Sequence, residues 1–128
     1  MRRCLRRGTG FTLIELLLVL AIIALMLTLA LPQYFHTIDG SKEKILAENL
    51  HVTRDAIDKF YGDTGRYPDS LQELVDKRYL RSLPYDPITE STTTWQIAAP
   101  DEQFPGNVYD IKSGASGADL NGQPYEAR

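Results

Sequence analysis

The sequence predicts an α+β fold in which a long, kinked N-terminal helix packs on a short second helix and a small antiparallel β-sheet. Three observations lead to this prediction. Residues 11–31 form an almost unbroken apolar run, a helical apolar pattern resumes after residue 40, and two short β-branched and aromatic segments follow. The 128 residues are enough for one domain of this kind.

The apolar run, FTLIELLLVLAIIALMLTLAL, is interrupted only by Thr12, Glu15 and Thr28. About 20 such residues span a bilayer as a helix. Arginines at positions 2, 3, 6 and 7 precede the run, so the positive-inside rule predicts a cytoplasmic N-terminus and an external C-terminal part. A cleavable secretory signal is the alternative, but it needs small residues after the run, where PQYF stands instead.

Charge is distributed unevenly along the chain. Removal of residues 1–10 takes four of the 14 Lys and Arg residues and no acid, so the formal net charge falls from −3 to −7. Such an acidic chain argues against nucleic acid as a partner, because phosphate binding needs clustered basic residues. Cys4 is the single cysteine, which excludes an intrachain disulfide.

Glu15 is the unusual residue of the apolar run. A lone carboxylate in a bilayer helix costs roughly 2.5 kcal/mol or more, and residues 11–31 contain no Lys, Arg or His to pair with it. It lies one turn from the start of the run, where it can reach the headgroups. Alternatively, a chain cut after Gly10 has a cationic α-amino group on Phe11, with a pKa of about 7.7–8.0. That cation can pair with Glu15 of a neighbouring copy and favour association.

The segment Gly10-Phe11-Thr12-Leu13-Ile14-Glu15, after basic residues and before an apolar helix, resembles the type IV prepilin processing motif. The resemblance implies that a prepilin peptidase cleaves after Gly10 and methylates Phe11, and that Glu15 is needed for assembly. Pro32 matches the position where pilin helices kink, and proline removes a helical hydrogen bond. The predicted organisation is a cleaved leader at 1–10, a transmembrane helix at 11–31 and a periplasmic pilin-like domain at 32–128.

Within residues 32–128, the helix is expected to continue to about residue 61, where Gly62 and Gly65 stop it. Its apolar stripe is predicted from Ile45, Asn49, Val52, Ala56 and Phe60, flanked by Leu46, Leu50, Ile57 and Tyr61. A short helix follows, capped by Asp69 or Ser70 with Glu73 in a capping box. Strands are predicted at residues 92–99 and 107–111.

The segments Gly65-Arg66-Tyr67-Pro68, Leu83-Pro84 and residues 108–114 resemble the G-type (major) pseudopilins of type II secretion systems. The resemblance implies a structural subunit of a periplasmic pseudopilus, assembled from the inner membrane to drive protein export across the outer membrane. It also implies other copies, other pseudopilins and an inner-membrane assembly platform as partners. The alternatives are a major or minor type IV pilin, acting in adhesion, motility or DNA uptake, and a non-polymerising single-pass membrane binding protein.

A calcium site is the one functional site predicted within the pilin-like domain. Asp110, Ser113, Ser116 and Asp119 lie in a glycine-rich loop, and oxygen ligands of this kind suit Ca²⁺. The resemblance points the same way, although G-type pseudopilins usually have an acidic residue near Ser116. Alternatively, these residues are turn formers. Neither His36 nor His51 has a nearby Cys, or an acid together with a nucleophile at a catalytic spacing. The chain is therefore predicted not to be an enzyme.

Overall fold

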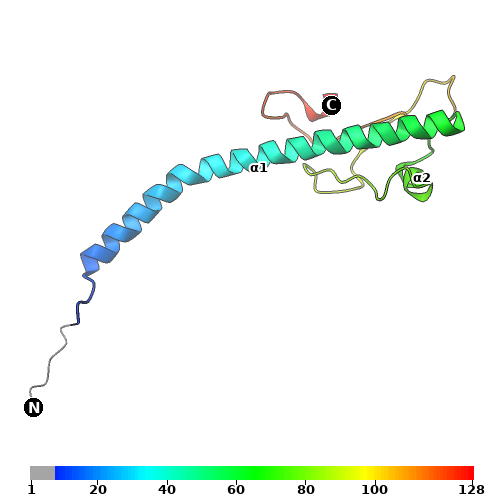
Figure 1. Ribbon diagram of the computed structural model, residues 1–128. Coiled ribbons are helices and arrows are strands. Elements are labelled where there is room, and N and C mark those ends of the chain that lie inside the picture. The colour runs from blue at the N-terminus through cyan, green and yellow to red at the C-terminus, as the bar shows by residue number, and fades with distance from the viewer. Residues whose placement is uncertain (1–7) are drawn as a thin grey trace, which may run out of the picture. The chain divides into compact units, whose positions relative to one another are not determined.

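The computed structural model describes residues 8–128. Along the chain lie α1 (Leu13–Thr64), α2 (Leu71–Asp76), β1 (Gln96–Ala98), β2 (Asp110–Lys112) and a 3₁₀ turn, η1 (Tyr125–Ala127) (Figure 1). The internal contacts of the chain divide it into two units, of which the first ends at Thr37 and the second is Ile38–Arg128. The predicted α+β architecture is confirmed: one long helix, one short helix and a two-stranded antiparallel sheet.

Helix α1 has 52 residues and contains Pro32. The kink predicted at Pro32 stays a prediction. The helix ends three residues beyond the expected position, at Thr64, and Gly65 follows with a positive φ of 73°. Glycine adopts this left-handed conformation without steric cost, which is why it commonly terminates helices. The Gly65 N–H donates to the carbonyl of Tyr61 at 2.8 Å and closes the last turn.

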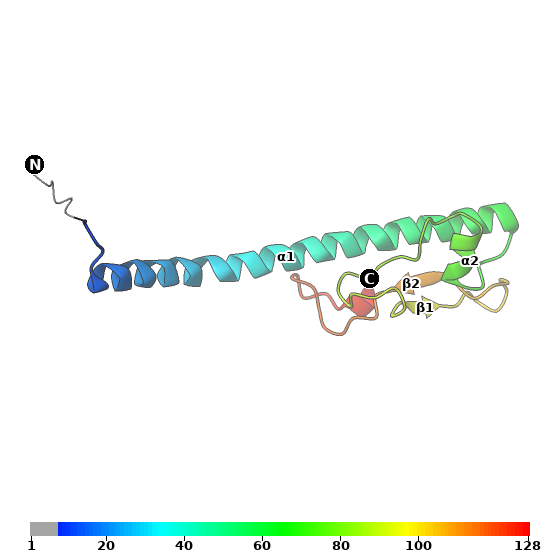
Figure 2. The same cartoon turned by 90° about the horizontal axis from the view of Figure 1, so that it is seen from below.

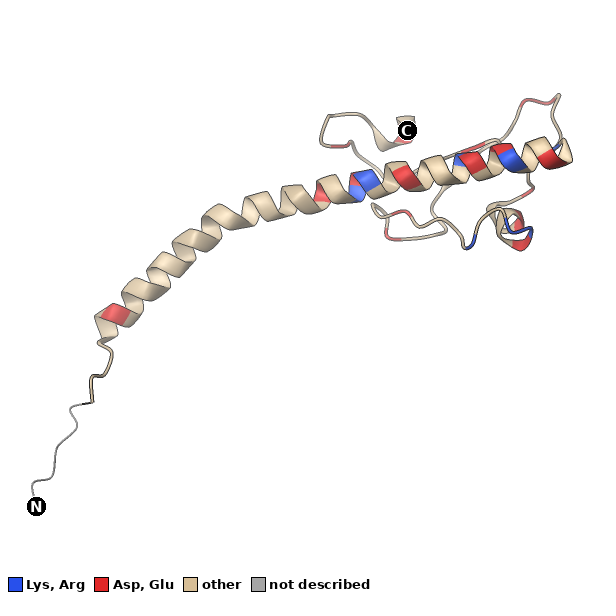
Figure 3. Cartoon of the chain, viewed as in Figure 1, with Lys and Arg blue, Asp and Glu red and all other residues tan. Residues whose placement is uncertain are grey.

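The first unit contains the apolar part of α1, which nothing else in the described chain covers. All side chains of residues 13–31 are exposed, including those of Leu13, Ile14 and Leu29. Glu15 is the one charged residue in residues 13–31. Figure 3 shows the charges of α1 concentrated in the C-terminal half of the helix. By length and composition, α1 is the one helix among residues 8–128 that could cross a membrane.

The second unit has its core on one face of α1. Leu46, Leu50, Ile57 and Phe60 are almost fully buried, in one cluster with Leu74 of α2 and Ile111 of β2 among others. Figure 2 shows α2, β1 and β2 beside this part of α1. The predicted stripe was partly wrong, because Ile45 and Val52 are half exposed. The buried row is set by Leu46, Leu50, Thr53, Ile57 and Phe60.

Thr53 explains why the buried row of α1 differs from the apolar stripe predicted from the sequence. It is polar but almost fully buried, and its hydroxyl donates to the carbonyl of Asn49 at 2.7 Å. A buried hydroxyl costs little when it is hydrogen-bonded within its own helix. The position that looks polar in the sequence therefore faces the core, and apolar Val52 faces outward.

Helix α2 begins as predicted. Ser70 is its N-cap, and the Ser70 Oγ accepts the N–H of Glu73 at 3.3 Å. The Glu73 carboxylate accepts a hydrogen bond from the N–H of Asp69 at 2.8 Å. It also accepts a bidentate pair of hydrogen bonds from the Arg66 guanidinium, at 2.5 and 3.2 Å. The Arg66 hydrogen bond, followed by the Asp69 N–H, lowers the pKa of Glu73 below its ordinary value. These bonds join the segment that follows α1 to the first turn of α2.

The sheet is smaller than predicted. Strands β1 and β2 pair antiparallel over three residues, with Ile97 opposite Ile111. The predicted strand 107–111 starts only at Asp110, because the N–H groups of Asn107 and Val108 both donate to the carbonyl of Pro68. The predicted strand 92–99 starts only at Gln96. The preceding Trp95 is buried and donates from Nε1 to the carbonyl of Pro84 at 2.8 Å.

Close backbone contact at Gly114 generates a stability prediction. A Cβ at this position would lie 1.9 Å from the carbonyl oxygen of Thr94. Gly114→Ala should therefore force the 92–95 and 113–115 segments apart and lower the free energy of unfolding by roughly 1–3 kcal/mol or more. The measurement is thermal unfolding of the full chain in detergent, followed by the near-ultraviolet signal of buried Trp95.

Gly62→Ala is the matched control, because a Cβ there meets no atom within 4 Å and the residue lies inside α1. Alanine should stabilise a helix at such a site by up to about 1 kcal/mol. Equal melting temperatures for the two variants would contradict the close approach at Gly114.

Candidate functional site

The residues predicted for processing lie directly before α1. Gly10 and Phe11 are outside any helix or strand, and both are exposed, Phe11 to 89%. An exposed peptide bond without secondary structure is readily accessible to a peptidase. The four leader arginines and Cys4 lie outside the described residues.

Thr12 sets the start of α1 and was missed in the sequence. Its Oγ1 accepts the N–H of Glu15 at 3.2 Å, and its carbonyl accepts the N–H of Leu16 at the same distance. Thr12 and Glu15 have the spacing of a capping box, Ser/Thr-x-x-Glu, which would have revealed this role. The helix therefore begins two residues after the Gly10–Phe11 bond.

Glu15 lies in the first turn of α1 and is exposed. A carboxylate in the first turn is favourable, because the helix dipole places partial positive charge there. No Lys or Arg occurs between residues 8 and 41 of the sequence. Within this stretch, the helix N-terminus is therefore the main feature that stabilises the Glu15 charge.

The four residues predicted to bind calcium are occupied by other partners or exposed. Asp110 Oδ1 accepts from Arg54 Nε at 2.7 Å and from the N–H of Ile111 at 2.8 Å. Buried Ser113 donates to buried Asp86 at 2.5 Å. Ser116 is exposed. Asp119 forms an ion pair with Arg128.

Asp110 and Asp119 also lie beside parts of α1 that are far apart along the helix axis. Asp110 binds Arg54, whereas the N–H of Leu120, next to Asp119, donates to Glu43 at 2.8 Å. Glu43 and Arg54 are 11 positions apart, which is about 16 Å of helical rise. Calcium binds its oxygen ligands at 2.3–2.6 Å. Within residues 8–128, no three acidic, histidine or cysteine side chains are placed to hold a metal. The arrangement does not fit the predicted site.

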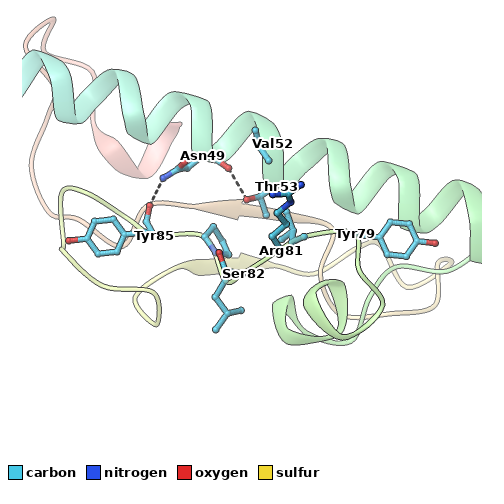
Figure 4. Close-up of a pocket in the computed structure, with 10 residues that line it drawn as sticks. Asn49, Val52, Thr53, Tyr79, Arg81, Ser82 and Tyr85 are labelled. Atoms are coloured by element: carbon cyan, nitrogen blue, oxygen red, sulfur yellow. Dashed lines mark hydrogen bonds between the residues drawn. The ribbon is translucent and has the colours of Figure 1, made fainter.

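The most prominent hollow, of about 440 Å³, lies between α1 and residues 79–85 (Figure 4). Figure 4 shows Asn49 at its edge, donating from Nδ2 to the carbonyl of Tyr85 at 2.6 Å. The Tyr79 hydroxyl donates to Asp63 at 2.7 Å. The hydrogen bond raises the pKa of Tyr79, which makes it a poor general base near neutral pH. The residues that line this hollow include no Cys, His, Asp or Glu.

Comparison with known proteins finds a family motif at the N-terminal end of the chain, where the exposed Gly10–Phe11 bond and the apolar part of α1 lie. Residues 5–31 match the prokaryotic N-terminal methylation motif. This motif and the exposed apolar part of α1 together indicate a membrane anchor. No solved structure matches the chain.

The chain is similar to the type II secretion system core protein G of Pseudomonas aeruginosa, at 29% identity over 88% of this chain and 87% of the relative. The core protein G of Aeromonas hydrophila is 26% identical, over 64% and 68%. The type IV major pilin protein PilA of Myxococcus xanthus is 35% identical, but over only 53% of this chain and 31% of the relative. The chain therefore carries the N-terminal motif of methylated pilin-like proteins and is similar, over most of its length, to core protein G of type II secretion systems.

Proposed function

We propose that this chain is a structural subunit of a type II secretion pseudopilus, a periplasmic filament that drives protein export across the outer membrane. The observation that supports this most is the similarity to core protein G, which extends over most of both chains and therefore includes most of the second unit. The exposed apolar surface of residues 13–31 is a second support, since a polymer of such helices would bury it.

Processing comes first in this proposal. The basic leader keeps the N-terminus in the cytoplasm, residues 11–31 span the inner membrane once, and the second unit lies in the periplasm. A prepilin peptidase cuts after Gly10 and methylates Phe11. The exposure of both residues and their place outside α1 are compatible with this cut.

The inner-membrane assembly platform then moves the subunit from lipid into the filament. Lipid contacts of the apolar part of α1 are replaced by contacts with the same part of other copies and of other pseudopilins. Lipid tails are as apolar as leucine, so the exchange has little hydrophobic driving force of its own. A polar contact that is satisfied in the filament and unsatisfied in the isolated subunit would add a driving force to the packing of the helices.

Glu15 and the α-amino group of Phe11 supply that contact. Both charges lie at the start of α1, where the helix dipole favours Glu15 and disfavours the amine. An amine at this helix N-terminus therefore gains from pairing with a carboxylate, and in this proposal Glu15 of a neighbouring copy supplies it. In a low-dielectric helix bundle such a pair is strongly attractive, and it aligns one α1 axially against the next.

A type IV pilus subunit is the alternative function. The fimbrial protein EcpC of Eikenella corrodens supports it, at 36% identity over 58% of this chain and 52% of the relative. A non-polymerising membrane binding protein is a weaker alternative. In either filament the chain is a structural component and not an enzyme, and its filament contacts are with proteins and not with nucleic acid.

Deletion of the gene in its host separates secretion from pilus function. We expect exported proteins to accumulate folded in the periplasm, with the number of surface pili unchanged, and a plasmid copy to restore export. The measurement compares activity of an exported protein in periplasmic and culture fractions with pilus counts by electron microscopy. Normal export together with loss of surface pili would establish the pilus alternative instead.

Glu15→Ala separates processing from assembly. We expect the variant to be inserted and cleaved, because Gly10 and Phe11 are unchanged, but to be absent from sheared filaments. Intact mass of the membrane-extracted protein should show a methylated chain that starts at Phe11 for both wild type and variant. Glu15→Asp is the control that keeps the charge, and it should assemble better than Glu15→Ala.

An uncut wild-type chain that starts at Met1 would contradict the whole processing scheme. Normal filament yield from a correctly cleaved Glu15→Ala would leave processing intact and contradict only the role of the carboxylate.

A further inference from the structure

The C-terminal segment, residues 113–128, is attached to α1 through a buried carboxylate. Glu43 of α1 is only 9% exposed. Its Oε1 accepts the N–H of Leu120 at 2.8 Å and the hydroxyl of buried Tyr125 at 3.3 Å. These bonds hold the segment at one point of the helix.

A second buried carboxylate, that of Asp119, binds other residues of the same segment. The side chain of Asp119 has no exposed surface. Its Oδ1 accepts the N–H groups of Asn121 and Gln123, both at 2.8 Å, and its Oδ2 accepts from Arg128 Nη2. The Asp119 N–H in turn donates to the carbonyl of Gln123 at 2.9 Å. The guanidinium of Arg128 thus compensates a charge that would be costly to bury alone.

This geometry is unsuitable for a divalent cation at Asp119. Amide N–H groups present their positive ends to Oδ1, and Oδ2 is taken by a guanidinium. A calcium ion would have to displace Arg128 and would still lack Asp110, which binds Arg54 about 16 Å further along α1. A calcium site instead needs six to eight oxygens that converge on one point.

We propose that the Arg128 guanidinium neutralises Asp119 where the family resemblance implies a calcium ion. The C-terminal segment of the second unit would then fold without a metal. The positive charge that neutralises Asp119 is supplied by the chain itself. Folding of the second unit is then independent of the calcium concentration around it. The inference concerns folding alone and applies equally to a secretion or a pilus subunit.

The test is hydrogen–deuterium exchange of the full chain in detergent, read by mass spectrometry on peptides within residues 113–128. Wild-type protein should exchange at the same rate in EGTA and in millimolar calcium chloride, and its melting temperature should also be the same. Arg128→Gln should exchange on the order of tenfold faster in this segment, because a hydrogen-bonded charge pair is lost. Arg128→Lys keeps the charge and should be intermediate.

Arg81→Gln is the matched control, since Arg81 is exposed and forms no ion pair among the described residues. It should leave exchange in residues 113–128 unchanged. The wild-type comparison with and without calcium needs no variant, so it decides the question even if Arg128→Gln does not fold. Slower exchange or a higher melting temperature in calcium would overturn the proposal, because a ligand that binds the native state must stabilise it. Wild-type exchange rates in Arg128→Gln would also overturn it.

Discussion

The apolar part of α1 is the constraint on which the rest of the molecule depends. A single helix satisfies its own backbone hydrogen bonds and can therefore sit in lipid, but it cannot bury its own side chains. Residues 13–31 are exposed on every side of the helix. Lipid can cover this surface, and so can the apolar helices of other subunits. A subunit that passes from one to the other must be anchored first and released later.

The start of α1 brings together three structural features within six residues. The Gly10–Phe11 bond is exposed, Thr12 caps the helix, and Glu15 occupies the first turn. Cleavage of that bond removes basic residues and also creates a new positive charge beside the helix N-terminus. In our proposal the same reaction that matures the protein therefore supplies the partner that Glu15 lacks in its own chain.

The second unit is stabilised differently, by polar contacts between loops as much as by its small sheet. Strands of three residues cannot hold a domain by themselves. Buried Asp86 instead accepts the Ser113 hydroxyl and the N–H groups of Ile88 and Thr89. Together with the contacts of Glu43 and Asp119, these bonds join the loops to one another and to α1. Among the described residues, every buried side-chain polar atom has a hydrogen-bond partner.

The parts of this structure that were predictable from sequence are those specified by local patterns. The apolar run, the Ser70 cap and the antiparallel pairing of β1 with β2 all follow from short-range rules. The errors have long-range causes. The second strand starts late because Pro68 takes the N–H groups of two of its residues. Nor does any local spacing in the loop identify Arg54, Asp86 and Arg128 as the partners of Asp110, Ser113 and Asp119.

The central claim is that the apolar part of α1 exchanges lipid for neighbouring copies during assembly. A photoreactive phenylalanine analogue at Leu20, which lies in the exposed part of α1, tests it directly in cells with and without an active inner-membrane assembly platform. We predict adducts mainly with lipid when the platform is inactive, and covalent dimers and higher multimers when it is active. Adducts with lipid alone in both states would contradict the account.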